Sequence, residues 1–169
     1  AKHILKWIDP DYVAYSWSER GSDERQYCAP GVDLPIASIM RTKYGKYPEY
    51  HTSLDDLINV VTPEGLEGGY EVLRLSIEAI ENNCYPRVAV FGEPQLGKRG
   101  LYPTISTKKS DSETRLLMEL ITWSDGGHSL LEIAAKCNTP IWELYPLIKK
   151  LQTHNLLTLE SERVKRLSH

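Results

Sequence analysis

A polar stretch at residues 106–112 divides the chain into two blocks with different patterns, and this change constrains the fold more than any other feature. Before it, strand-like and helix-like stretches alternate, which is typical of layered α/β domains. After it, three short helical patterns lead into a terminal strand pair, which is typical of a helix-turn-helix with a wing. We therefore predict part of an α/β sheet domain at residues 1–94, an inter-domain linker at 95–110 and a small, α-rich winged-helix domain at 111–169.

The clearest element of the first block is a helix from Pro63 to about Asn82. Thr62 is suited to cap it, and proline is favoured in the first turn of a helix. Asn82 and Asn83 are suited to end it, because asparagine tolerates the left-handed conformation. Its apolar residues recur at spacings of four and three, which defines one apolar face. These residues are Leu66, Tyr70, Leu73, Ile77 and Ile80.

Three stretches of the first block predict strands. Residues 12–17, 34–40 and 87–91 are rich in aromatic and β-branched side chains, which favour strands. Pro35 is near the start of the second stretch, a position where a strand accepts proline. We expect these strands to form one edge of a larger sheet.

The second block carries signals for helix starts and turns. Ser129 and Glu132 have the spacing of a reciprocal capping box. Pro146 is inside the third helical pattern, so we expect that helix to bend. Asn155 is suited to turn the chain into a strand at residues 156–159. The apolar residues of the three helical patterns are Leu116, Leu117, Leu120, Ile121, Leu130, Ile133, Ala134, Ile141, Leu144, Ile148 and Leu151.

Composition excludes several classes of protein. The 169 residues are 41% hydrophobic and 25% charged, which is ordinary for a globular protein and excludes a disordered or collagen-like chain. The net charge of −3 and a pI of about 6.0 give no overall basic field for nucleic acid. No apolar run approaches a membrane span, and no signal peptide is recognisable. The three scattered cysteines favour free thiols and a cytoplasmic location. Ala1 is not an initiator methionine, and a cut end would explain this.

Two segments carry the motifs with the most chemical information. The first reads GSDERQYCAPG from Gly21, and the second reads EYHTSLDDL from Glu49. Together they resemble the C-terminal part of the zinc aminopeptidase and glutaminyl-cyclase superfamily, where an S-D-x element precedes a Y-H-T-x-x-D element. Nearly the whole chain, with EPQLGKRGLYPT at residues 93–104 and then a winged helix, resembles the C-terminal half of a bacterial aminopeptidase-like family associated with polysaccharide biosynthesis.

The resemblance implies roles for five residues. His51 would be the terminal zinc ligand, Asp55 would brace its loop, and Asp23, Glu24 and Tyr50 would shape the site. Glu24 occupies a position where the wider superfamily often has histidine. A loop histidine that only makes hydrogen bonds is the alternative for His51. In the complete protein, zinc would activate a water that attacks a peptide or similar acyl bond.

The isolated chain lacks most of such a site. The superfamily places an H-x-D element and a Glu-Glu pair upstream of the segments seen here, and this chain contains neither. No catalytic residue is therefore assigned in this chain, which we expect to be inactive alone. Its first expected partner is the missing N-terminal part of its own catalytic domain.

Two further stretches suggest binding. Residues 92–98 match the start of a phosphate-binding loop, but Arg99 stands where that motif needs a hydroxyl for magnesium. We instead expect Lys98 and Arg99 to contact an anion or the other domain. Residues 41–50 interleave cations with aromatics, which suits either a solvated loop or a rim that selects substrate.

The winged-helix block suggests an alternative function. Between residues 111 and 160 there are seven acidic and four basic residues, so clustered cations for phosphate contacts are few. The presumed recognition helix opens without Arg, Asn or Gln, and only residues 163–166 are basic. The alternative to a hydrolase is therefore a non-catalytic interaction module, or a winged-helix regulator, that binds protein or, less favoured, DNA. The winged helix would contact a protein partner or a second copy of the chain. Trp142 and Tyr145 are candidates for such an interface.

Overall fold

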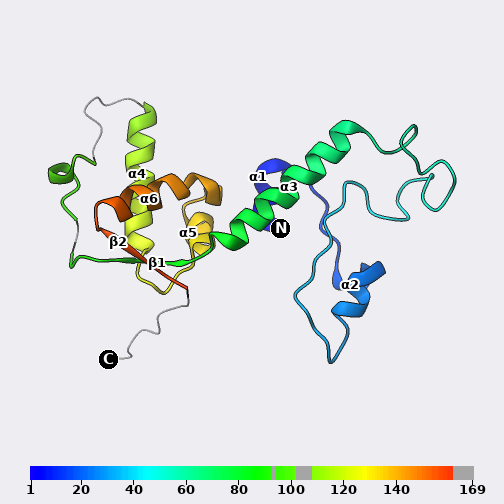
Figure 1. Ribbon diagram of the computed structural model, residues 1–169, viewed down its shortest axis with the longest axis horizontal. Helices are drawn as coiled ribbons and strands as arrows, with labels where there is room; N and C mark the ends of the chain where they lie inside the picture. The colour runs from blue at the N-terminus through cyan, green and yellow to red at the C-terminus, as the bar shows by residue number, and fades with distance from the viewer. Residues whose placement is uncertain (93, 102–107, 162–169) are drawn as a thin grey trace. The chain divides into compact units, whose positions relative to one another are not determined.

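The computed structural model describes residues 1–92, 94–101 and 108–161, and the chain divides into two compact units, Ala1–Ile77 and Glu78–His169 (Figure 1). Unit 1 contains α1 (Lys2–Ile8), η1 (Trp17–Glu19), α2 (Ser22–Tyr27) and most of α3 (Pro63–Glu81). Unit 2 contains β1 (Tyr85–Val88), η2 (Gly97–Arg99), α4 (Lys108–Trp123), α5 (Leu130–Lys136), η3 (Ile141–Glu143), α6 (Tyr145–Thr153) and β2 (Leu157–Glu160).

Unit 2 is a helical domain with a small antiparallel sheet. β1 pairs with β2 in a register that places Tyr85 opposite Glu160 and Val88 opposite Leu157. In Figure 1, α4, α5 and α6 gather beside this strand pair. The helices bury most of their predicted apolar residues, with Leu120, Ile133 and Leu144 at 0% exposure, whereas Leu116 and Ile121 are half-buried. The described residues of unit 2 thus fold around one apolar core.

The strand pairing corrects one prediction. The strand predicted at residues 87–91 is observed as β1, four residues long, and its partner is β2 at the other end of unit 2. It therefore belongs with the winged helix rather than with a sheet of the first block. Pairing between segments 70 residues apart leaves no local signal in the sequence, which is why it was not predicted.

The local signals of unit 2 are largely confirmed. Ser129 caps α5, because its hydroxyl accepts from the Glu132 backbone N–H at 3.3 Å and the Glu132 carboxylate accepts from the Ser129 N–H at 2.7 Å. Asn155 takes a left-handed conformation (φ 54°) before β2. The bend predicted at Pro146 is wrong. The third helical pattern is instead divided into η3 and α6, and Pro146 lies in the first turn of α6, where proline costs no hydrogen bond.

Unit 1 contains no strand in any of residues 1–77, all of which are described. The strands predicted at residues 12–17 and 34–40 are wrong as assigned, because both stretches are irregular apart from the start of η1. A strand needs a neighbour to complete its hydrogen bonds, and unit 1 offers none. The chain between α2 and α3 runs as open loops (Figure 1).

The predicted helix α3 is present, but its predicted apolar face is exposed. Thr62 caps it by accepting from the Gly65 N–H at 3.1 Å, and it ends at Glu81, close to the predicted end. Its buried residues are Val72, Leu75 and Ala79, whereas the predicted face is 49–73% exposed. That face consists of Leu66, Tyr70, Leu73, Ile77 and Ile80. Periodicity locates an apolar face but does not say whether anything covers it.

The three thiols are free, as predicted, and two of them are poor nucleophiles. Burial raises the pKa of Cys84, and burial together with the Glu119 carboxylate raises the pKa of Cys137 to about 11. Both therefore stay protonated at neutral pH. Among the described residues, no helix has the length and apolar character to cross a membrane.

We expect truncation in the core of unit 2 to destabilise the protein and truncation on the exposed apolar face of α3 to have little effect. Leu120→Ala should lower the free energy of unfolding by about 2–5 kcal/mol, because it leaves a cavity in a packed core. Leu66→Ala, the matched control, should change it by less than about 0.5 kcal/mol. Urea unfolding followed by far-UV circular dichroism measures both, and equal losses would contradict this division.

Candidate functional site

The first motif segment forms α2 and places two carboxylates in its first turn. Glu24 accepts hydrogen bonds from the Gly21 backbone N–H at 3.1 Å and from the Tyr44 hydroxyl at 3.0 Å. The Gly21 bond is the main reason why the pKa of Glu24 is lowered, and the Tyr44 bond adds to it. The side chain of Asp23 is exposed, and among the described residues no donor is found within hydrogen-bond distance of its carboxylate.

The Tyr44 hydroxyl lies close to the backbone of Gly21. A Cβ atom at position 21 would lie 2.7 Å from the Tyr44 hydroxyl oxygen, which is shorter than van der Waals contact allows. The first glycine of the motif therefore leaves room for a tyrosine from the segment that precedes the second motif. Partial burial and the bond to Glu24 raise the pKa of Tyr44, so its hydroxyl remains a donor at neutral pH.

Aromatic contacts connect Tyr44 to Tyr50 and His51 of the second motif segment. The ring centroids of Tyr44 and Tyr50 are 6.3 Å apart. Tyr50 stacks on the His51 imidazole, with a centroid separation of 4.1 Å and an interplanar angle of 18°. His51 has a left-handed backbone (φ 60°) and an exposed side chain. The imidazole is thus presented on a turn, with one face covered by Tyr50.

Asp55 holds this loop through a tyrosine rather than through the imidazole. The Tyr47 hydroxyl donates to Asp55 Oδ2 at 2.9 Å, and the Tyr47 and Tyr50 rings meet edge to face with centroids 5.7 Å apart. The bond to Asp55 raises the pKa of Tyr47. The Thr52 hydroxyl donates to the Glu49 carbonyl at 2.7 Å and closes the turn around His51. Asp55 is therefore bonded to a tyrosine of the same loop, and its role in shaping a metal site stays a prediction.

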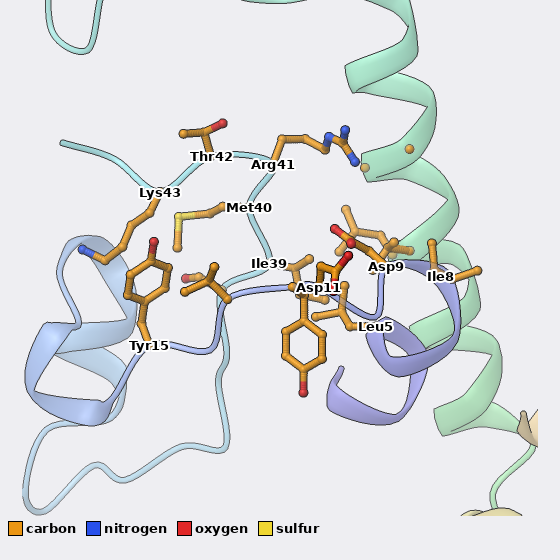
Figure 2. A pocket seen from close by; sticks show the side chains of 17 residues that line it. Leu5, Ile8, Asp9, Asp11, Tyr15, Ile39, Met40, Arg41, Thr42 and Lys43 are labelled. Carbon is orange, nitrogen blue, oxygen red and sulfur yellow. The ribbon is translucent and has the colours of Figure 1, made fainter. Parts of the chain in front are cut away.

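A pocket of about 470 Å³ lies in unit 1 between α1, α3 and the segment that leads to the tyrosines (Figure 2). Arg41 extends toward α3, where a Cβ at Gly68 would lie 3.1 Å from its guanidinium nitrogen Nη1. Asp9 and Asp11 contribute carboxylates to the same pocket. Lys43 lines this pocket too, and its ammonium lies 4.3 Å from the centre of the Tyr44 ring. Lys43 therefore lies against both this pocket and the Tyr44 ring.

The described residues do not form a metal site by themselves. In residues 1–92, 94–101 and 108–161, no group of three or more His, Cys, Asp and Glu side chains is placed to hold an ion. A hydrolytic zinc site has three protein ligands and an open position. This chain brings only one imidazole to its candidate site, so it does not fit zinc without further ligands.

Sequence reasoning found part of this cluster. The structure joins the predicted Glu24, Tyr50 and His51 through Tyr44, and it ties Asp55 to them through Tyr47. Neither connecting tyrosine was assigned to the site. Their signal was the alternation of cations and aromatics at residues 41–50, which we interpreted only as a possible rim.

The predicted contacts of Lys98 and Arg99 remain predictions. Both are exposed side chains of η2 in unit 2. The basic stretch at residues 163–166 lies outside the described residues, as do Glu93 and residues 102–107 of the predicted linker.

Two protein-family models match this chain, each over a different part. Residues 1–83 match the family described as a domain of unknown function (DUF4910), and residues 83–159 match a winged helix-turn-helix family. The second match agrees with the fold of unit 2. The first covers both motif segments and α3.

A curated protein and a solved structure, both from Clostridium acetobutylicum, resemble this chain. One, whose name assigns it to polysaccharide biosynthesis and gives it an aminopeptidase-like domain, is 38% identical over 79% of this chain. The other is a crystal structure described as that of a peptidase, with 31% identity and a TM-score of 0.75 over 94% of this chain. The chain spans about a third of their lengths, 31% and 34% respectively. This chain is therefore similar to part of proteins whose names refer to an aminopeptidase-like domain and to a peptidase.

We expect the Glu24 carboxyl to titrate below the ordinary glutamate range. Because its pKa is lowered in the folded state, the stability it contributes is present above the ordinary pKa and is lost as the pH falls through the folded pKa. Tyr44→Phe should return the pKa only part of the way, since the Gly21 N–H still donates. Carbon-detected NMR titration measures both values, and a wild-type pKa at or above the ordinary one would contradict the assigned bonds.

Proposed function

We propose that this chain is part of a peptidase-like hydrolase, to which it contributes His51 as one ligand of a catalytic metal. The observation that carries the proposal is the connected cluster of Glu24, Tyr44, Tyr50 and His51. It joins the two motif segments on which the resemblance to the aminopeptidase superfamily rests. A histidine that served only in loop packing would not need a neighbouring tyrosine tied to a second motif.

The proposed metal is zinc, and its remaining ligands lie outside this chain. Neutral imidazole is a common zinc ligand, and the His51 side chain is exposed on a braced turn. The carboxylates nearest in the cluster already accept hydrogen bonds, Glu24 from Gly21 and Tyr44, and Asp55 from Tyr47. Their proposed role is to hold the loop, because one oxygen of each carboxylate already accepts from a neighbouring donor.

The reaction class we propose is hydrolysis of a peptide or similar acyl bond by the complete protein. Support comes from relatives whose names refer to an aminopeptidase-like domain and to a peptidase. One of those names also refers to polysaccharide biosynthesis. The first partner we propose is the remainder of the catalytic domain, because this chain spans only a third of those relatives.

For unit 2 we favour contact with protein over contact with DNA. Lys150 lies 3.6 Å from the Glu113 carboxylate, and the Lys136 ammonium lies 4.0 Å from the centre of the Trp123 ring. Arg115 also forms an ion pair with Glu119 at 3.0 Å, so three of the four cations between residues 111 and 160 are engaged within the unit. Binding to phosphates needs cations that are clustered and free to exchange their counterions.

We expect His51→Ala in the complete protein to lower bound zinc and hydrolysis of an aminoacyl arylamide roughly tenfold or more, because ligand loss weakens metal binding. His154→Ala is the matched control, since His154 lies in unit 2 and bonds only to the Lys150 carbonyl of its own helix among the contacts described. Metal content by mass spectrometry gives a readout besides activity. Unchanged zinc and unchanged turnover in His51→Ala would sink the proposal.

A further inference from the structure

Unit 1 contains a second pocket, which the proposed metal site does not use. It encloses about 310 Å³, at the lower end of the range of about 300–1,000 Å³ that is typical of small-molecule sites. It adjoins the pocket shown in Figure 2, because Tyr15, Met40 and Lys43 line both. We call it the Tyr44 pocket. The other charged and aromatic side chains of its lining include Trp17, Glu19, Arg20, Glu24 and Tyr44.

Tyr44 connects this pocket to the candidate site. It lines the pocket, and its ring centroid lies 6.3 Å from that of Tyr50. Tyr50 in turn stacks on the His51 imidazole at 4.1 Å. The wall of the pocket is therefore linked to the proposed metal ligand through two aromatic rings, which places the pocket where it can hold part of a substrate.

The carboxylates of the Tyr44 pocket already have hydrogen-bond donors. Glu19 accepts from the Ser16 backbone N–H at 3.0 Å and from the Ser16 hydroxyl at 2.9 Å. Glu24 accepts from the Gly21 N–H and the Tyr44 hydroxyl. The backbone bonds are the main reason why the pKa of each carboxyl is lowered, so both are ionised at neutral pH. Both carboxylates therefore have partners within the chain.

Arg20 has hydrogen-bonding capacity to spare. Its Nη1 donates to the Trp17 carbonyl at 2.9 Å, and its guanidinium carbon lies 4.0 Å from the centre of the Trp17 ring. Its Nε is buried and has no hydrogen-bond partner among the described residues. A buried donor without an acceptor is destabilising, so an acceptor supplied by a ligand would be favourable here.

The Lys43 ammonium is held by aromatic rings rather than by a carboxylate. It lies 4.3 Å from the centre of the Tyr44 ring and 5.2 Å from the centre of the Tyr15 ring (Figure 2). Its charge contributes to the lowered pKa of Glu19, but no ion pair of Lys43 is found within the described part of the chain. Aromatic faces attract an ammonium without neutralising it. Lys43 therefore keeps a positive charge that an anion can use.

The remaining lining is apolar and flat. Trp17, Ile36 and Met40 line the pocket and are 54%, 42% and 40% exposed. Such side chains pack well against the aliphatic or planar part of a ligand. With Lys2 included, the pocket has three cationic and two anionic side chains, so cations are in excess. The lining therefore suits an anionic group on a short apolar stem.

We propose that the Tyr44 pocket binds a carboxylate of the substrate and that Arg20 and Lys43 select it. Guanidinium and ammonium groups bind carboxylates through short, charge-assisted hydrogen bonds. The proposal rests on the proposed function, which makes the substrate a peptide or similar compound, since carboxylates are the acidic groups that peptides carry. The carboxylate belongs either to an acidic side chain or to the end of the peptide. Arg20 and Lys43 bind it and take no part in breaking the acyl bond.

The test measures the binding of three small probes to the 169-residue chain by NMR titration. N-acetylglutamic acid α-amide has only a side-chain carboxylate, N-acetylglutamine has only a chain-end carboxylate, and N-acetylglutamine amide is the neutral control. At least one carboxylate probe should bind about tenfold or more tightly than the control and shift the Trp17 indole and Tyr44 amide signals. The probe that does so identifies the source of the carboxylate. Added salt should weaken this preference.

Variants assign the preference to the pocket. Lys43→Gln should reduce the preference for a carboxylate about fivefold or more, whereas Lys43→Arg, which keeps the charge, should retain most of it. Arg20→Lys should also reduce it, because a lysine cannot replace the Nε donor. Lys46→Gln is the matched control, since Lys46 is an exposed cation of the same segment that does not line the pocket, and it should change nothing.

Equal affinity for all three probes would overturn the proposal, and so would a carboxylate preference that Lys43→Gln leaves unchanged. No binding of either carboxylate probe at about 10 mM would also overturn it. These measurements use neither metal nor turnover, so failure of the His51 proposal would leave them unchanged. Conversely, equal binding of the probes would leave the zinc content of the His51→Ala protein unaffected.

Discussion

The apolar core of unit 2 is the interaction on which the ordered part of this protein depends. Of the eleven largest fully buried side chains, ten lie in unit 2, and Ile4 is the exception. Each fully buried leucine or isoleucine contributes about 1.5–3 kcal/mol, so this core offsets the entropy of ordering three short helices and a two-stranded sheet. Unit 1 has no comparable core. Its structure depends on a few short-range interactions, among them the capping box of α2 and the turn at His51.

Short-range interactions of this kind also form the candidate site. Gly21 admits Tyr44, Tyr44 reaches Glu24, and the tyrosine rings lead to the imidazole of His51. Each contact is partly exposed and contributes little free energy by itself, but together they fix one imidazole on a turn. The tyrosine cluster is therefore formed by local contacts, and the described residues add no further metal ligands beside His51. Lys43 lies next to both the pocket beside Arg41 and the tyrosine cluster, because it lines the pocket and its ammonium lies 4.3 Å from the centre of the Tyr44 ring.

What the sequence could predict depended on how local the cause was. The Ser129–Glu132 cap, the turn at Asn155 and the start of α3 at Thr62 follow from neighbouring residues, and all three are confirmed. The pairing of β1 with β2 and the link from Tyr44 to Glu24 join distant segments, so no pattern specified them. The exposed apolar face of α3 shows a different limit. Its periodicity was read correctly, but periodicity does not say whether anything covers an apolar face.

Hydrogen–deuterium exchange of the 169-residue chain, read by mass spectrometry, tests the central claim that a complete unit is joined to an incomplete one. Amides of α4, α5, α6 and the strand pair should be protected to nearly the global stability of unit 2. Amides between α2 and α3, at residues 28–62, should exchange orders of magnitude faster, because they lack regular hydrogen-bonded structure and a core to cover them. Protection of residues 28–62 equal to that of unit 2 would contradict the account, since it would show that unit 1 is already complete.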